Sequence, residues 1–439
     1  LLGGIAVVLA LAAASAGVLA ALRRLAGLLV VVVLAAVAAA AVLSRPGAVP
    51  LDVLPTLLGA AAGLWSLSSL LDRARSAEDQ TDAGRRAFVR QAVALAVLAA
   101  AAGAVSQVVQ ASTRAARASR ARLRLPAPTG PVPSGTQLAD LRLRGLSPLI
   151  TSPEDFYRID TALVVPQVDA SQWRLRVHGM VDEDVELNLD GLLALPLVER
   201  MVTLTCVSNE VGGDLVGNQV WRGALIRDVL RLAGPASDAD MVLSTSADGW
   251  TAGTPLDALT DPGRDAMLAV AMGGEPLPVQ HGFPVRMVVP GLYGYVSATK
   301  WLVDLEVTRF DRAEGYWTPR GWSARGPIKT ESRIDVPRSG ANVRVGPVTV
   351  AGVAWAQHRG IEAVEVRVDE GPWQRAQLGD GGTTDTWRQW VWTWAATAGD
   401  HTLQVRAVDR TGSVQTGREA PPAPDGASGW HTVDVTVRG

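Results

Sequence analysis

The sequence predicts a multi-domain chain with N-terminal transmembrane helices, an α+β domain and a C-terminal immunoglobulin-like β-sandwich. Three observations predict this class: long apolar runs within residues 1–112, a mixed strand and helix pattern over 141–325, and regular short strands over 326–439. Residues 113–140, rich first in Arg and then in Pro, predict a linker before the α+β domain.

Four apolar runs account for the N-terminal prediction. They cover residues 1–22, 25–43, 51–71 and 87–109. Each approaches the length that crosses about 30 Å of hydrocarbon as a helix. The sequence therefore predicts an anchor of about four helices over 1–112 and a multi-pass location in the cell membrane.

Arginines suggest how this anchor is oriented. Several lie between the third and fourth runs, which predicts a cytoplasmic loop there and an extracytoplasmic catalytic domain. The arginines of residues 114–124 then fall on the outer side, against the same rule. Arg85 and Arg86, which precede an apolar stretch, are typical of a twin-arginine export signal, although two ordinary juxtamembrane arginines would look the same.

The remaining elements follow from side-chain periodicity. In the α+β domain we expect strands at 173–178, 202–206, 242–244, 285–289 and 302–307, and a helix at 225–232. In the sandwich we expect strands at 348–355, 364–368, 387–394, 402–407 and 432–437. A period of two places Trp390, Trp392 and Trp394 on one face of their strand.

Composition limits the function. The 41 Lys and Arg balance 43 Asp and Glu, so we expect no nucleic-acid partner. One cysteine excludes an internal disulfide and an iron–sulfur cluster held by four thiolates of this chain. The first 125 residues contain no His, Met or Cys, so no haem ligands are evident in the anchor.

Cys206 is the first candidate functional residue. A lone cysteine is most often an inert core residue. Here it ends an apolar strand and precedes a polar loop with two glycines, where a ligand can approach closely.

A second candidate cluster runs from His281 to Lys300. His281 and Arg286 flank one end of a strand, and a glycine-turned loop that ends in Lys300 follows it. These donors could converge on an anion such as a phosphate. A β-hairpin with solvated charges explains the spacing equally well.

Together these segments resemble the sulfite oxidase family of molybdopterin enzymes. Residues 272–286, MGGEPLPVQHGFPVR, with Pro290-Gly291 and Lys300-Trp301, are similar to the family's pterin-binding signature. Cys206-Val207-Ser208-Asn209 matches its Cys-x-x-Asn motif. The resemblance implies a sulfite-oxidase-like molybdopterin domain over 141–325 and, over 326–439, an Ig-like domain that mediates dimers in the family.

The resemblance also implies roles for individual residues. Cys206 would be the catalytic thiolate ligand of molybdenum, and Arg158 a second catalytic residue. The expected cofactor contacts are Phe156, Tyr157, Arg158, Ser246, His281, Arg286, Ser297, Ala298, Thr299 and Lys300. Two departures are visible: Glu210 and Val211 follow the Cys motif where sulfite-oxidising members have basic residues, and the loop up to Lys300 is one residue longer.

The implied activity is oxygen-atom transfer at a molybdenum–molybdopterin cofactor, with a small sulfur compound such as sulfite as substrate. Reduction of S-oxides or N-oxides is an alternative, and a non-catalytic, membrane-anchored ligand- or partner-binding protein is another. The expected partners are the membrane, a small-molecule substrate, a separate cytochrome- or quinone-linked electron carrier and a second copy of the chain.

Overall fold

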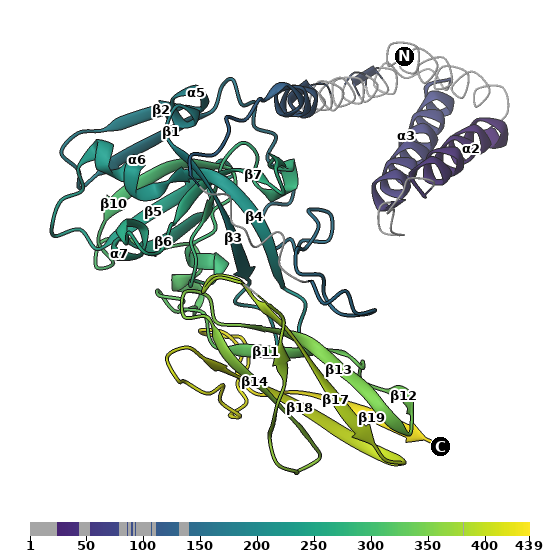
Figure 1. The fold of residues 1–439 in the computed structure, drawn as a ribbon. Coiled ribbons are helices and arrows are strands. Elements are labelled where there is room, and N and C mark those ends of the chain that lie inside the picture. Colours follow the sequence, from purple (N-terminus) through teal and green to yellow (C-terminus); the bar gives the residue numbers. More distant parts are fainter. Residues whose placement is uncertain are drawn as a thin grey trace. The chain divides into compact units, whose positions relative to one another are not determined.

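A computed structural model describes residues 24–43, 53–78, 86, 89, 90, 93, 107, 111–130, 140–380 and 382–439. The chain divides into two compact units, Leu1–Gln110 and Ala111–Gly439. In the first unit, helices α2 (Arg24–Leu43) and α3 (Leu54–Glu78) contact each other (Figure 1).

The predicted membrane anchor over 1–112 is wrong. Within the described ranges, no helix is both long enough and apolar enough to cross a membrane. Helix α3, for example, contains several serines and ends in charged residues, which lowers its mean hydropathy. The finding also overturns the multi-pass membrane location, whereas the membrane as a partner stays a prediction.

Other parts of the N-terminal prediction are not described. The expected spans at 1–22 and 87–109 lie wholly or largely outside the described residues, and so does Arg85. The twin-arginine signal therefore stays a prediction.

Part of the predicted linker is ordered against the second unit. Residues 111–122 are helical, and Arg120 donates from Nε to the carbonyl of Leu277 and from Nη2 to that of Pro276, at 2.8 and 2.7 Å. Thr129 donates its backbone N–H to Leu197 at 2.7 Å. The Pro-rich residues 131–139 lie outside the description.

The α+β domain consists of one mixed and one antiparallel sheet with short helices around them (Figure 1). The first sheet has the order β2-β1-β10-β5-β6, and the second has β3-β4-β7-β8 with β9 paired to β7. The strands are β1 Arg174–Gly179, β2 Val185–Asn188, β3 Leu197–Thr205, β4 Val216–Leu225, β5 Met241–Ser246, β6 Thr251–Pro255, β7 Met267–Met272, β8 Glu275–Pro276, β9 Arg286–Val288 and β10 Leu302–Thr308. The helices are α5 Leu189–Leu193, α6 Ile226–Ala233, α7 Leu256–Thr260 and the 3-10 turns η3 Val279–His281, η4 Gly294–Val296 and η5 Thr318–Arg320.

The strands and the helix expected from periodicity are confirmed as β1, β3, β5, β9, β10 and α6. Strand β4 was not expected, because Asn218 and Gln219 make its sequence look polar. Both are buried, and their side chains donate to the carbonyls of Leu149 and Thr151 at 2.8 and 2.7 Å. A buried polar side chain is tolerated where its hydrogen bonds are made, which a sequence pattern does not reveal.

The C-terminal domain is a β-sandwich, as expected. Its sheets have the orders β11-β13-β17-β16 and β12-β19-β18-β14-β15. Trp390 and Trp394 are buried and Trp392 is partly buried on one face of β17, which confirms the period-two prediction. The strands are β11 Glu331–Val336, β12 Ala341–Arg344, β13 Gly346–Trp355, β14 Ile361–Val368, β15 Gln374–Arg375, β16 Gln377–Leu378, β17 Arg388–Ala396, β18 Gly399–Asp409 and β19 His431–Arg438.

The sandwich holds the end of β3 directly. Gln357, fully buried, donates to the carbonyl of Thr203 at 2.9 Å and to Oγ1 of Thr205 at 3.0 Å. The backbone N–H of Thr203 donates to the backbone carbonyl of Asp385 at 2.9 Å. The Thr203 hydroxyl accepts from the backbone N–H of Trp387 at 2.7 Å. The C-terminal domain therefore fixes the strand that leads to Cys206.

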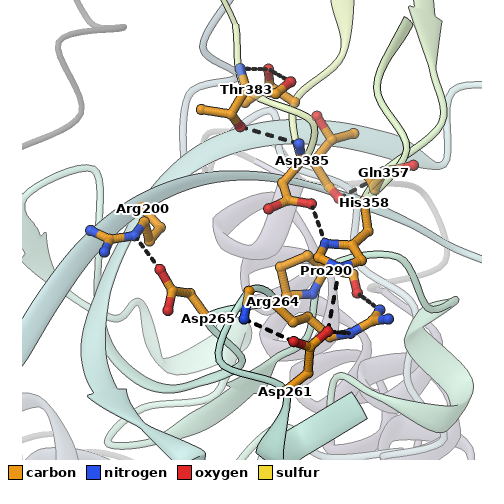
Figure 2. A network of polar contacts seen from close by, with 12 residues as sticks. Arg200, Asp261, Arg264, Asp265, Pro290, Gln357, His358, Thr383 and Asp385 are labelled. Carbon is orange, nitrogen blue, oxygen red and sulfur yellow. Dashed lines mark hydrogen bonds and ion pairs between the residues drawn. The ribbon is translucent and has the colours of Figure 1, made fainter. Parts of the chain in front are cut away.

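A polar network also joins the C-terminal domain to the α+β domain, and we call this region of contact the junction (Figure 2). His358 lies between two carboxylates, with its ring nitrogens 3.3 Å from Asp385 and 3.6 Å from Asp261. Arg264 donates to the carbonyl of Pro290 at 2.6 Å, at the start of the loop that leads to Lys300. Both segments that carry candidate site residues are thus tied to the junction.

Candidate active site

Cys206 follows the last residue of β3 and is 7 % exposed. Burial raises the pKa of its thiol, while hydrogen bonds from Ser208 and the charge of Lys300 oppose that shift. Its backbone N–H donates to Leu215 at 2.9 Å, which holds the turn after the strand closed. The thiol is therefore fixed in place and is neutral at neutral pH unless a cation or a metal stabilises the thiolate.

One pocket gathers most of the candidate residues. Cys206 lines it together with residues from the segment before β1, the β5–β6 turn, and the loops on either side of β9. The candidates that line the pocket are Phe156, Tyr157, Cys206, Ser246, His281, Arg286, Ala298 and Lys300. The tertiary structure thus brings together side chains from four separate segments.

Arg286 is the buried cation of this pocket. Its side chain lies 5.0 Å from the Trp221 ring and donates to the backbone carbonyls of His281 and Ala298 at 3.2 and 3.4 Å. Burial lowers the pKa of Arg286 to about 10, so it stays charged at neutral pH. No carboxylate of the described residues forms an ion pair with it, although an unpaired buried charge carries a large desolvation penalty. An anionic ligand would remove that penalty.

Lys300, in contrast, has a carboxylate partner. Its Nζ lies 2.6 Å from Asp160 and donates to the carbonyl of Ile159 at 3.1 Å. Burial lowers the pKa of Lys300 to about 8, and Asp160 opposes the shift. Burial also works against ionisation of Asp160, but hydrogen bonds from Arg158 and Lys300 outweigh it and hold its pKa below the ordinary range.

His281 is a neutral member of the site. Burial, and then the charge of Arg286, lower the pKa of His281 to about 4. Its Nε2 lies 2.8 Å from the carbonyl of Pro153, and a carbonyl only accepts, so Nε2 carries the proton. The other ring nitrogen, Nδ1, is then a hydrogen-bond acceptor.

Two buried polar atoms near Cys206 lack a protein partner among the described residues. They are Oγ of Ser246, which lines the pocket, and Nδ2 of Asn209 in the Cys motif. Buried polar groups are otherwise almost always paired. Ser246, together with the unpaired Arg286, fits a polar, anionic ligand in this pocket.

Three expected contacts do not line the pocket. Arg158 is exposed and pairs with Asp160 at 2.9 Å. Ser297 donates to the carbonyls of Leu292 and Tyr293, and the hydroxyl of Thr299 lies 2.7 Å from that of Ser244. The side chains of Ser297 and Thr299 therefore hold the loop itself, while Ala298 between them faces the pocket.

Sequence reasoning missed the aromatic wall of the pocket and the acid next to Lys300. Trp250, Tyr295, Trp317 and Trp322 line the pocket, and so does Asp160. The tryptophans lie in loops with no recognisable spacing, and the only signal was the density of aromatic residues at 316–322.

Comparison with known proteins defines the class. Residues 162–317 match the model of an oxidoreductase molybdopterin-binding domain, and residues 331–405 match a bacterial Ig domain. The first match covers three of the four segments that carry the candidate residues in the pocket, and residues 156–161 precede it. The chain therefore contains an oxidoreductase molybdopterin-binding domain, and the non-catalytic alternative is dropped.

Individual relatives define the family. Sulfite oxidase of Gallus gallus is 30 % identical over 320 residues, which are 62 % of this chain and 69 % of that protein. An oxidoreductase of Bacillus subtilis, YuiH, is 35 % identical over 158 residues, which are 36 % of this chain and 76 % of that protein. The chain belongs to the sulfite oxidase family of molybdopterin-binding oxidoreductases.

Two further comparisons concern a longer relative and a solved structure. Human mitochondrial sulfite oxidase is 30 % identical over 338 residues, and the chain spans 62 % of that protein's length. The crystal structure of the sulfane dehydrogenase SoxCD from Paracoccus pantotrophus has a TM-score of 0.57 at 23 % identity, and the match covers 66 % of this chain and 82 % of that one. That likeness shows a shared fold.

Proposed function

We propose that this chain exchanges an oxygen atom between water and a small sulfur compound, with a molybdenum–molybdopterin group held in the pocket described above. The observation that carries the proposal is that Cys206 shares one pocket with Arg286, a buried cation that has no carboxylate partner among the described residues. When bound, the group supplies two-electron oxygen-atom transfer.

Several residues would hold this group. Cys206 would provide the metal ligand, since a thiolate is a soft donor and a bound metal lowers the pKa of its ligand thiol. Arg286 would bind the phosphate with its planar fork. His281 would accept a hydrogen bond at Nδ1, and Ser246 would use its unpartnered hydroxyl.

The remaining residues would support these contacts. Lys300 would act within its pair with Asp160, and Arg158, which does not line the pocket, would act by orienting that carboxylate. Phe156 stacks on Tyr157 and meets the His281 ring edge-on, with ring centroids 5.2 and 5.8 Å apart, so it would fix both rings.

The first test measures molybdenum and pterin in protein purified from a host that makes the cofactor. About one molybdenum per chain is expected for wild type. A folded protein without molybdenum or pterin would reject the proposed function.

The second test replaces Cys206 by Ser. An inert buried thiol would lose about 1–3 kcal/mol of stability if the new hydroxyl finds no partner, and turnover would persist. A metal ligand behaves differently, because a hard hydroxyl replaces a soft thiolate. We expect turnover to disappear while most of the pterin remains; retained activity would remove Cys206 from its role.

Electrons would leave or arrive through a separate carrier, since one cysteine rules out an iron–sulfur cluster held by four thiolates of this chain. The carrier and a homodimer through the C-terminal domain are both predictions. Light scattering of the full chain tests the dimer.

A further inference from the structure

The charge around the pocket bears on the substrate class. Among the described residues, Arg286 and Lys300 are the only lysine or arginine side chains that line it. Lys300 is paired with Asp160, and in the proposed function Arg286 is used by the cofactor phosphate. His281 is neutral above its pKa of about 4. Among the described residues that line the pocket, no cation therefore remains available to bind a small anionic substrate.

Acidic groups make the pocket still less suited to an anion. Asp248, on the exposed turn between β5 and β6, also lines the pocket. The residues of the loop after Cys206 that line the pocket, Val207 and Ser208, add no positive charge. A dianion such as sulfite loses its hydration on entering a pocket, and that loss is repaid only where charged donors replace the water.

Aromatic rings form one wall of the pocket, which we call the aromatic wall. Trp322 lies between Tyr295 and Trp317, with ring centroids 5.9 and 6.3 Å away, and Trp250 lines the same pocket. The hydroxyl of Tyr295 is directed away as a donor to Ser323, at 2.7 Å, so its ring meets the pocket. Aromatic rings pack well against alkyl groups and against divalent sulfur.

From these observations we infer that the substrate is a neutral organic sulfur compound, a thioether or its S-oxide, and that inorganic sulfite is a poor substrate. The inference rests on the proposed function. In the reducing direction the S=O bond breaks, sulfur gains two electrons from a one-electron donor that acts twice, and the oxygen leaves as water after taking up two protons. The oxidising direction is the reverse, with water as the oxygen source and a one-electron acceptor.

The experiment compares substrates on cofactor-loaded full-length protein. Reduction of methyl phenyl sulfoxide by a reduced viologen dye, oxidation of methyl phenyl sulfide by an oxidised dye, and oxidation of sulfite are measured as kcat/KM. We expect one of the two organic reactions to exceed sulfite by at least about tenfold. A sulfite preference, or no turnover of either organic compound by loaded protein, overturns the inference and leaves the proposed function standing. Protein without molybdenum rejects the proposed function itself.

Variants then test whether the aromatic wall is responsible for the preference for an organic substrate. Trp317→Ala is expected to raise KM for the organic substrate about tenfold with unchanged molybdenum content, and Trp317→Phe to restore most of it. Trp373→Ala, in the C-terminal domain, is the matched control. Equal effects of Trp317→Ala and Trp373→Ala would overturn the role of the wall.

Charge reversal gives an independent readout. Asp248→Arg is expected to raise kcat/KM for sulfite about threefold to tenfold, because a cation then faces the pocket mouth. Glu370→Arg, an exposed residue in a turn of the C-terminal domain, makes the same charge change elsewhere. An equal gain from both reversals would mean that net charge alone is responsible and would count against the inference.

Discussion

The pocket around Arg286 and the junction drawn in Figure 2 both contain charged side chains, but the junction pairs its arginines with carboxylates, whereas Arg286 in the pocket has no carboxylate partner among the described residues. At the junction Asp265 pairs with Arg200 and Arg227 at 2.8 and 2.9 Å, and His358 lies between two carboxylates. In the pocket Arg286 has carbonyls and a Trp ring instead. A carboxylate partner offsets the desolvation cost of a buried cation, whereas an unpaired buried cation indicates where an anionic ligand binds.

The largest expected effect separates these two kinds of arginine. Arg286→Ala should lower pterin content at least tenfold, since hydrogen bonds to charged groups contribute about 1.5–3 kcal/mol each. The cofactor-free variant should be no less stable than cofactor-free wild type, because an unpaired buried charge is gone. Pterin fluorescence of the denatured protein and urea unfolding measure the two quantities.

Arg264→Ala is the matched variant at the junction. It removes the donor to Pro290 and should lower stability while leaving pterin occupancy in the folded fraction near wild type. If Arg264→Ala lost pterin as completely as Arg286→Ala, the contrast between the two regions would fail.

A pH effect is expected at Glu331, a buried acid at the start of β11. Burial raises the pKa of Glu331 to about 8, and Lys329 only partly opposes this. Its stabilising contribution is complete below the unfolded pKa near 4.5 and is lost as pH rises to about 8, because only the unfolded state ionises in that window. Relative to Glu331→Gln, wild type should lose on the order of a few kcal/mol between these pH values. Parallel stability curves for the two proteins would contradict this.

Gln357→Ala tests the junction itself. The carbonyl of Thr203 and the hydroxyl of Thr205 would lose their donor in a buried place, which should cost about 1–3 kcal/mol of unfolding free energy. Gln374→Ala, at an exposed position of β15, serves as the control. Denaturant midpoints of the two variants should therefore differ, and equal midpoints would argue against a role of the junction in holding β3.

The smallest effect is expected at an exposed pair. Arg176 and Asp184 lie 2.7 Å apart with more than half of each side chain exposed. Asp184→Ala should change the unfolding free energy by less than about 1 kcal/mol. A larger loss in urea unfolding would show that exposure is a poor guide to the value of an ion pair here.

Some features could be predicted from local sequence because local chemistry decides them. Period-two alternation identified β13, β14, β17, β18 and β19, and the Cys206 and 272–286 motifs directed attention to the pocket residues. Hydrophobicity alone misjudged the N-terminal region, since apolar runs were counted as membrane spans without weighing the serines and the terminal charges of α3.

The sequence by itself determined which residue types were available: one cysteine, an arginine within a glycine- and proline-bounded strand, and a strand-rich C-terminal region. Only the tertiary structure decided which of them are unpaired. Lys300 and Arg286 look alike as cations in the sequence, yet Asp160 approaches the first from 140 residues away and no described carboxylate pairs with the second. Long-range packing sets such partners, because desolvation and ion pairing depend on distances in space that residue spacing does not fix.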